Sequence, residues 1–400
     1  MTAPAPRVIA PGNGAVIGFL GGGQLGRMTA LAARAMGYGV HVLDPDGECA
    51  TAAVADRAIA ARFDDVDAAR ELARNCGVVT LEIEQIATSV LDAAATYAPV
   101  RPGSRMIGII QDKSKQKTWL RDNGFPVGDF RNATSLSELR AALDTLGDSY
   151  VKSCHGGYDG RSQSRAGASA DADAAWRSLG ERPVVVERAL ELAGEMSVMI
   201  ARRPSGDVVV FPAALNHHER AILSWSATPA PLSRELLDRA TEIGRGIAEQ
   251  MQLAGLLAAE LFITTKGELL VNELAPRPHN SFHATERGCV TSQFEQLVRA
   301  VCDLPLGDTS IVRPAAIVNL FGDLWTNGAQ PDFSRAMRVA GVRVHLYGKR
   351  GARPGRKMGH ISAIGGSVMD ALAAARDAAR AVGANTEDPP QSLRAFGVPL

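Results

Sequence analysis

Residues 256–281 read LLAAELFITTKGELLVNELAPRPHNS, and this stretch decides the fold of the central part of the chain. Two apolar runs, 256–263 and 268–272, are separated by Thr264-Thr265-Lys266-Gly267. Short apolar runs bounded by a glycine-containing connection are typical of paired β-strands. We therefore expect a hairpin of two buried strands here.

Each of these two strands carries one glutamate. Glu260 interrupts the first apolar run, and Glu273 follows Asn272 at the end of the second. Hairpin pairing can bring both carboxylates to one face, and an ionised carboxylate in an apolar strand is costly unless it is paired or metal-bound. Two carboxylates beside an amide oxygen suit Mg²⁺. The alternative is an ion pair, for example with Arg277.

The segment after the hairpin, 275–281, is dense in polar groups and held by Pro276 and Pro278. Proline fixes the backbone of a loop, which suits a binding loop on a rigid scaffold. An ordinary turn is the alternative.

The start of the chain alternates between strand and helix patterns. The turn Gly21-Gly22-Gly23-Gln24-Leu25-Gly26 follows a short strand and precedes a helical repeat, and Asp44 ends the next strand. This is the dinucleotide-binding pattern, in which backbone N–H groups face a phosphate and an acid reaches a ribose. A tight turn that needs glycine only for packing explains it equally well. The alternation favours a parallel sheet with helices on both faces, ending near residue 110, built from strands 15–20, 38–44 and 78–83 and helix 27–36.

The rest of the chain changes character. Strands at 149–153 and 183–187 flank a glycine-rich loop at 156–160, and short strands alternate with Gly/Pro turns from residue 311 to 366. The helical patterns cover 112–123, 234–253, 291–303 and 368–382.

The composition limits the possible functions. The 400 residues indicate two or three domains, or one large enzyme built in layers, and 46% hydrophobic residues exclude disorder over the whole length. Lys+Arg and Asp+Glu both count 43, so no overall positive field attracts nucleic acid or a membrane surface. Five dispersed cysteines disfavour a disulfide framework or a zinc site. Without a signal-peptide pattern or a long apolar run, we expect a cytoplasmic, soluble enzyme.

A basic cluster lies near the end of the chain. Between Lys349 and Lys357 there are five cations, interrupted by two glycines and a proline. Such a loop suits one small phosphate, with Arg donating in a fork and Lys adding a point charge. A solvated surface loop is equally compatible with the composition, but Tyr347 is the one aromatic residue beside the cluster, which disfavours single-stranded nucleic acid.

The order of these motifs resembles the ATP-grasp superfamily. Within it, GGGQLGRM at 21–28, GGYDGR at 156–161, NELAPRPHNS at 272–281 and RPGRKMGH at 353–360 are similar to the motifs of N5-carboxyaminoimidazole ribonucleotide synthases. The resemblance covers nearly the whole chain after the Pro/Gly-rich tail at residues 1–14, and the last three motifs together are specific.

The resemblance implies an α/β fold, with α+β character in the ATP-grasp part. It comprises an N-terminal Rossmann-like domain (1–111), an ATP-grasp domain (112–307) with a lid at about 124–195, and a small β-rich C-terminal domain (308–400).

It also implies site residues by position. The ATP positions are Lys113, Lys152, Gly157, Tyr158, Asp159, Gly160, Arg161, Ser162, Gln163, Glu187, Arg188, Ala189, Leu190, Glu195, His218, Asn272 and Glu273. The metal ligands are Glu260 and Glu273, for Mg²⁺ or Mn²⁺. The aminoimidazole ribonucleotide positions are Gln24, Leu25, Glu82, Tyr158, Asp159, Arg161, Asn280, Lys349, Arg356 and Lys357, and the expected catalytic residues are Asp159, Arg161, Glu82 and Arg277.

The implied reaction is the carboxylation of 5-aminoimidazole ribonucleotide by bicarbonate, driven by ATP through carboxyphosphate in purine synthesis, by a homodimer. Two positions depart from the family pattern: Ser162 replaces a usual glycine, and Phe282 precedes His283, which puts a role for His283 in doubt. A formate-dependent glycinamide ribonucleotide transformylase shares the EIE segment at 82–84 and the PRPH run but lacks the Tyr158-Asp159 pair. An NAD-dependent dehydrogenase explains only residues 15–44. A non-catalytic nucleotide-binding module leaves the glutamate pair unexplained.

Overall fold

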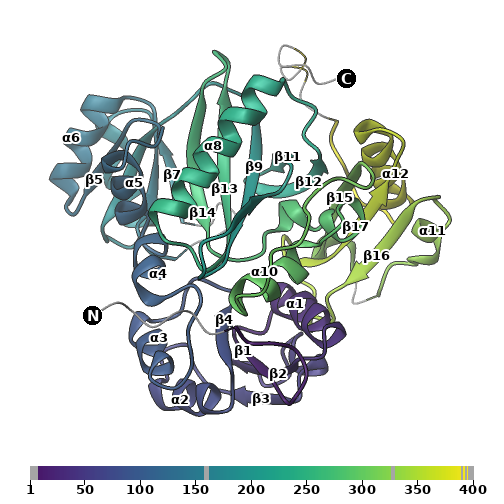
Figure 1. The fold of residues 1–400 in the computed structure, drawn as a ribbon. Helices are drawn as coiled ribbons and strands as arrows, with labels where there is room; N and C mark the ends of the chain where they lie inside the picture. The colour runs from purple at the N-terminus through teal and green to yellow at the C-terminus, as the bar shows by residue number, and fades with distance from the viewer. Residues whose placement is uncertain (1–7, 157–161, 326–328, 389–390, 392–393, 395–400) are drawn as a thin grey trace.

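The computed structural model describes residues 8–156, 162–325 and 329–388, with Gln391 and Arg394. Three sheets organise these residues (Figure 1). In Figure 1 the N-terminal sheet lies below, a small sheet lies at the upper left, and a long central sheet runs from the middle to the right. The α/β character and the N-terminal parallel sheet predicted from the sequence are confirmed.

The N-terminal sheet is parallel, as predicted, and has four strands in the order β3-β2-β1-β4, of which β3 was not among the predicted strands. All four residues of β4 are buried, as expected for a strand covered on both faces. The elements are β1 (Val16–Leu20), α1 (Gln24–Ala35), β2 (Gly39–Asp44), η1 (Ala52–Val54), β3 (Arg57–Ala60), α2 (Val66–Arg74), β4 (Val78–Leu81), α3 (Thr88–Ala95) and α4 (Ser104–Ile110).

The first helix begins three residues before the predicted start at Arg27. The turn is complete at Gly23, and Gln24 is already helical. The Glu82 carboxylate accepts hydrogen bonds from the Gly23 and Gly26 N–H groups at 2.8 and 3.0 Å. It thus satisfies donors that a helix start leaves without intrahelical partners.

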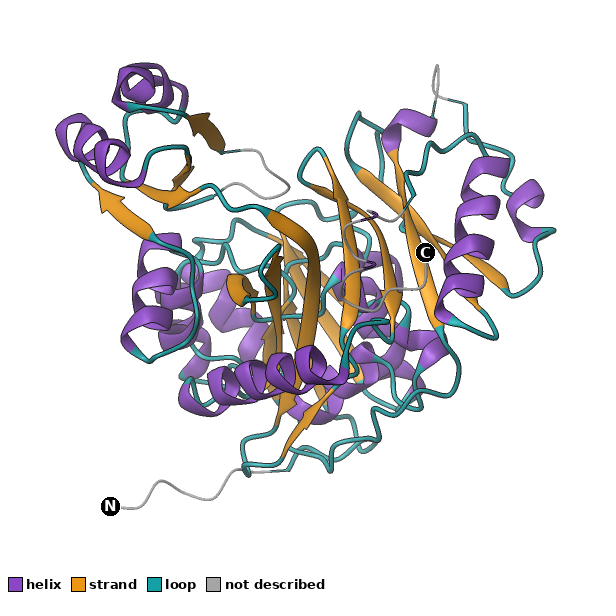
Figure 2. Ribbon diagram, turned by 90° about the horizontal axis from the view of Figure 1, so that it is seen from above, coloured by secondary structure: helices purple, strands orange, loops and turns teal. Residues whose placement is uncertain are grey.

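The small sheet has four antiparallel strands in the order β5-β8-β6-β7. Two helices pack on it through Leu143 and Trp176, which share an apolar cluster with Val151 and Val186. The elements after the connecting helix α5 (Lys113–Asp122) are β5 (Phe130–Ala133), α6 (Leu136–Leu146), β6 (Ser149–Ser153), β7 (Gln163–Ala166), η2 (Ser169–Asp171), α7 (Ala172–Ser178) and β8 (Val184–Arg188). We call this unit the lid, and Figure 2 shows it standing to one side of the central sheet.

The central sheet is antiparallel, in the order β14-β13-β9-β11-β12-β15-β17-β16, with β10 beside β9. The ladder continues without a break from β12 into β15, where Trp225 pairs with Val318. The predicted C-terminal strands therefore extend the same sheet, although the domain boundaries stay a prediction. The strands are β9 (Leu192–Arg202), β10 (Val208–Val210), β11 (Ala214–Glu219), β12 (Ile222–Thr228), β13 (Gly255–Thr264), β14 (Leu269–Ala275), β15 (Ala315–Phe321), β16 (Val342–Leu346) and β17 (Lys357–Ile364).

Helices cover this sheet (Figure 2). They are α8 (Arg234–Gln250), η3 (Asn280–Phe282), α9 (Thr285–Gly288), α10 (Gln293–Val301), η4 (Gly322–Leu324), α11 (Ser334–Met337) and α12 (Val368–Ala381). The predicted helix 234–253 ends earlier because Gln252 has a positive φ of 53° and the Leu253 N–H turns back to the Ala248 carbonyl. Among the described residues, no helix has the length and apolarity needed to cross a membrane.

Candidate active site

The predicted hairpin is present and places its two glutamates opposite each other. Glu260 of β13 pairs with Glu273 of β14, and a bulge follows Glu260. Directly opposed residues of an antiparallel pair point to the same face, so both carboxylates face one side of the sheet.

A cavity of about 320 Å³ lies between this hairpin and the lid. Its wall carries residues from both units, and ligand pockets often lie between two structural units. The predicted ATP and metal positions that line it are Lys113, Lys152, Ser162, Gln163, Glu187, Arg188, Leu190, Glu195, His218, Glu260, Asn272 and Glu273. Ala189 does not line it, and its N–H donates to the Asp148 carbonyl. Gly157, Tyr158, Asp159, Gly160 and Arg161 lie outside the described residues.

A lysine missing from the sequence prediction, Lys117, lines this cavity. The buried Lys117 Nζ is 3.2 Å from Glu187 Oε2, and Lys152 Nζ is 3.2 Å from Glu187 Oε1. Lys117 also donates to the Val271 carbonyl at 3.2 Å. Its position four residues after Lys113 puts both on the same face of α5, and this spacing was the available sequence signal.

Two ammonium groups act on the Glu187 carboxyl. Burial alone would raise its pKa, but Lys117 and Lys152 outweigh burial and lower the pKa to about 2. Glu187 therefore stays ionised and offsets part of the positive charge that lines the cavity.

The lowered pKa of Glu187 predicts an acid-dependent loss of stability. The ionised form stabilises the folded state by about 3 kcal/mol above pH 4.5, its ordinary pKa. This contribution is lost as the pH falls towards 2. We expect the unfolding free energies of wild type and Glu187→Gln, measured by urea denaturation, to converge over this interval. A constant difference between them would contradict the assigned ion pairs.

The two opposed glutamates have different surroundings. The His279 Nε2 lies 2.9 Å from Glu260 Oε1. Burial alone would raise the pKa of Glu260, but His279 and His218 lower it to about 2. Burial raises the pKa of Glu273, helped by the carboxylates of Glu260 and Glu84.

The Glu273 carboxylate makes no hydrogen bond or ion pair with any described residue. Such a carboxylate, facing a second one in a polar cavity, fits a divalent cation with oxygen ligands. The alternative of an ion pair with Arg277 is wrong, because Arg277 pairs with Glu84 instead. Its Nε and a second guanidinium nitrogen donate hydrogen bonds to the Glu84 carboxylate at 2.6 and 3.2 Å.

The predicted ribose contact is also paired. His218 Nδ1 of β11 lies 2.9 Å from Glu195 Oε2 of β9. Burial would lower the pKa of His218, but the Glu195 carboxylate outweighs burial and raises it. This contact brings the His218 ring and the Glu195 carboxylate together at the cavity wall.

The glycine turn at the start of the chain does not offer a dinucleotide site. Glu82 occupies the helix N-terminus where a phosphate would lie, and Asp44 accepts from the Gly22 N–H at 2.8 Å. A Cβ at Gly23 would lie 2.5 Å from Glu82 Oε1, so glycine is needed for this approach. The NAD-dependent dehydrogenase alternative is therefore wrong.

The same carboxylate is a predicted substrate and catalytic residue. Burial raises the pKa of Glu82, opposed by its two backbone donors and by the charges of Arg277 and Lys349. Gln24 and Leu25 form the first turn of α1 beside it, with the Leu25 side chain buried.

The basic loop, residues 349–357, lies near Glu82, because the charge of Lys349 acts on that carboxyl. Lys349 Nζ donates to the Lys357 carbonyl at 3.0 Å and lies 5.5 Å from the centre of the Tyr347 ring. Arg356 donates to the Gly351 carbonyl at 2.8 Å and also contacts the Arg350 carbonyl, so its guanidinium supports the loop. Phosphate contacts by Lys349, Arg356 and Lys357 stay predictions.

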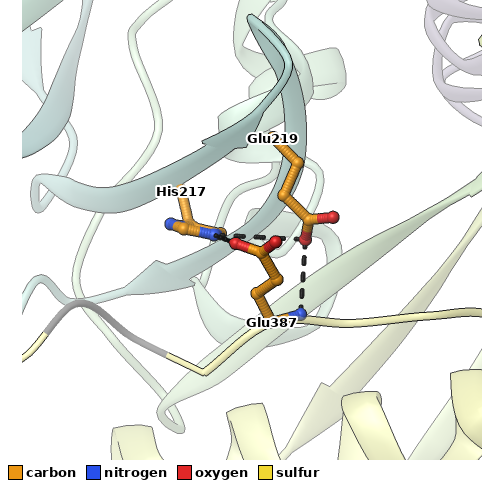
Figure 3. A group of neighbouring side chains, drawn as sticks. All are labelled: His217, Glu219 and Glu387. Carbon is orange, nitrogen blue, oxygen red and sulfur yellow. Dashed lines mark hydrogen bonds and ion pairs between the residues drawn. The ribbon is translucent and has the colours of Figure 1, made fainter.

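A second group of ionisable side chains lies outside the cavity wall (Figure 3). His217 Nε2 of β11 is 3.3 Å from Glu387 Oε2 and 4.0 Å from Glu219 Oε1. The Glu387 N–H donates to Glu219, and the His217 ring stacks on Trp225. These contacts join the C-terminal segment to the central sheet.

The fold and the cavity define an ATP-grasp protein. The ATP-grasp domain family matches residues 118–294, the ribonucleotide synthetase preATP-grasp domain matches 15–111, and the phosphoribosylaminoimidazole carboxylase C-terminal domain matches 315–374. The chain belongs to the N5-carboxyaminoimidazole ribonucleotide synthase family.

Individual relatives show this membership over nearly full length. The Bacillus subtilis N5-carboxyaminoimidazole ribonucleotide synthase is 38% identical over 87% of this chain and 91% of its own. The Brucella melitensis enzyme is 38% identical over 88% and 96%.

Solved structures agree with the sequence relatives. The ADP complex of an N5-carboxyaminoimidazole ribonucleotide synthetase has a TM-score of 0.87 at 38% identity, covering 94% of this chain and 98% of its own. The Aspergillus clavatus synthase in complex with ADP and 5-aminoimidazole ribonucleotide has a TM-score of 0.84 at 30% identity, covering 92% and 99%. The predicted family is confirmed, and the transformylase and the non-catalytic module are set aside.

Proposed function

We propose that this protein catalyses the ATP-dependent carboxylation of 5-aminoimidazole ribonucleotide by bicarbonate, giving N5-carboxyaminoimidazole ribonucleotide, ADP and phosphate. One observation carries the proposal within the family. Glu273, without a partner among the described residues, faces Glu260 on a cavity wall that also presents Lys113 and Lys152.

The first step is phosphoryl transfer. A bicarbonate oxygen attacks the γ-phosphorus of ATP, the bond to the β-phosphate oxygen breaks, and carboxyphosphate and ADP form. This chemistry needs mainly positioning and charge neutralisation. Lys113 and Lys152 supply positive charge to the phosphates, while Glu260 and Glu273 would hold Mg²⁺. When bound, the metal neutralises charge on the phosphate oxygens.

The second step forms the new C–N bond. The exocyclic amine of the ribonucleotide attacks the activated carbon, phosphate leaves, and the amine loses a proton. Glu82 is a candidate for accepting this proton because burial raises its pKa and so makes its carboxylate a stronger base, although Arg277 and Lys349 oppose this rise. Asp159 is the other candidate. Carboxyphosphate must be kept from water, which gives the lid a physical purpose.

The proposal is tested by substrate pairs. ADP release should require Mg²⁺ and rise with 5-aminoimidazole ribonucleotide plus bicarbonate. Stimulation by glycinamide ribonucleotide plus formate instead would move the activity to the transformylase class. A lack of response to either pair would refute an ATP-driven reaction on these ribonucleotides.

We expect Lys349→Ala to weaken binding of the ribonucleotide. A charge-assisted hydrogen bond to its 5′-phosphate is worth about 1.5–3 kcal/mol, so KM for the ribonucleotide should rise roughly 10- to 150-fold. KM for ATP should stay within about twofold. Arg353→Ala, an exposed cation of the same loop, is the matched control. Equal KM values for wild type and Lys349→Ala would place the phosphate elsewhere.

A further inference from the structure

Gln293, the first residue of α10, has an amide orientation that backbone atoms determine. Its Oε1 accepts from the His279 N–H at 2.8 Å, and its Nε2 donates to the His279 carbonyl at 3.0 Å. A backbone N–H can only donate and a carbonyl can only accept. The oxygen and nitrogen of this fully buried amide are therefore assigned without ambiguity.

The orientation of Gln293 determines the tautomer of His283. Gln293 Nε2 lies 3.2 Å from His283 Nδ1, so the amide donates and Nδ1 accepts. His283 is fully buried between the rings of His360 and Phe294, at centroid distances of 4.6 and 5.7 Å. Burial lowers its pKa well below the usual value, so the ring is neutral. A neutral ring that accepts at Nδ1 carries its proton on Nε2.

The tautomer of His283 in turn determines how the Asn280 amide lies. His283 Nε2 is 2.9 Å from Asn280 Oδ1, so the imidazole donates and the amide oxygen accepts. Asn280 is 9% exposed. Its Nδ2 makes no hydrogen bond with any residue that the structure describes. The free end of this amide is therefore the end with two N–H donors.

The hydrogen bonds that run from Gln293 through His283 to Asn280 lie beside the reaction site. Asn280 follows His279, whose imidazole contacts the carboxylate of Glu260. On the other side of the ring stack, the Tyr347 hydroxyl lies 2.8 Å from His360 Nδ1, and Lys349 lies over the Tyr347 ring. The stack thus lies between the loop that carries Asn280 and the strands that carry the basic loop.

We propose that Gln293 and His283 are positioning residues for the ribonucleotide: they fix the Asn280 amide so that its N–H groups donate to an acceptor atom of 5-aminoimidazole ribonucleotide. The inference rests on the proposed function. It assigns His283 a purpose beyond packing, because an apolar ring would fill the same stack without needing buried hydrogen-bond partners.

His283→Phe separates the hydrogen bonds from the ring packing. It keeps an aromatic ring between His360 and Phe294 but removes both polar nitrogens. We expect KM for the ribonucleotide to rise roughly 10- to 100-fold, with KM for ATP within about twofold. His345→Phe is the matched control, because His345 stacks on the other side of His360 at 4.4 Å and has no hydrogen bond to the Asn280 loop among the described residues.

A double-mutant cycle tests whether His283 acts through Asn280. If it does, His283→Phe should raise KM for the ribonucleotide no further in an Asn280→Ala background. A further rise there would overturn the inference, as would equal KM values for His283→Phe and His345→Phe. A wild type that does not carboxylate the ribonucleotide would refute the proposed function itself.

Asn280→Asp keeps the test independent of whether His283→Phe folds. Aspartate is nearly the same size and still accepts from His283 Nε2, but it replaces the free N–H donors by an acceptor oxygen. We expect a loss of ribonucleotide binding at least as large as that of Asn280→Ala, with wild-type thermal unfolding. An unchanged KM for the ribonucleotide would overturn the inference.

Discussion

Glu273→Gln should reduce ATP-dependent carboxylation by roughly 10³-fold or more. The glutamine keeps the size of the side chain but removes the charge opposite Glu260. Glu260 and Glu273 would hold Mg²⁺, and the bound metal would stabilise the transferring phosphoryl group by several kcal/mol, where each 1.36 kcal/mol is about tenfold in rate. Steady-state ADP release at saturating Mg²⁺ measures the loss.

Glu268→Gln is the matched control for this substitution. Glu268 lies on the same hairpin, is exposed, and contacts Thr264 in the connection. Its replacement should leave the rate within about twofold, since surface substitutions rarely matter. Full activity of Glu273→Gln would show that this carboxylate has no part in phosphoryl transfer.

Glu187→Gln should destabilise the protein and weaken nucleotide binding together. The side chain of Lys117 is only 5% exposed and faces Lys152 through the Glu187 carboxylate. Removing one partner of a buried ion pair lowers the free energy of unfolding by about 3–5 kcal/mol. Burial already lowers the pKa of Lys117 and Glu187 opposes this, so the variant should favour the neutral amine. Urea denaturation at neutral pH and ADP titration measure the two effects.

Glu191→Gln provides the control for the Glu187 experiment. Glu191 is exposed and lies just beyond the end of β8. The Glu191→Gln protein should unfold at the same urea concentration as wild type and bind ADP with the wild-type affinity. Wild-type stability of Glu187→Gln would mean that the two lysines do not depend on this carboxylate.

The central hairpin could be predicted because its information is local. Apolar runs on both sides of Thr264–Gly267 indicate two strands, and pairing across so short a connection leaves few registers for Glu260 and Glu273. The parallel N-terminal sheet could be predicted in the same way, because strand and helix patterns alternate along the first part of the chain. The hairpin pattern also indicated a Mg²⁺ site at Glu260 and Glu273, and the cluster of cations at 349–357 indicated a phosphate site. The other ATP and ribonucleotide positions came from the family resemblance, because no local pattern gives their roles.

What the sequence could not provide are contacts between distant segments. The Arg277–Glu84 pair joins residues 193 positions apart, and the Glu82 bond to Gly23 spans 59 positions. The sequence allowed a phosphate site at the glycine turn because no residue near the turn indicates that the Glu82 carboxylate accepts hydrogen bonds from its N–H groups. The sequence did not predict a role for Lys117, because its partner Glu187 belongs to the lid and only the fold brings the lid next to α5.

The unbroken ladder from β14 to β16 means that the last fifth of the chain, from residue 315 on, is not a detachable module. If the chain stopped before β15, the backbone groups of Trp225–Thr228 that pair with β15 would become a bare sheet edge, with Ala227 and Trp225 uncovered beside it. Exposed apolar edges invite pairing with other chains. A shortened protein should therefore aggregate, and the C-terminal strands expressed alone should do the same.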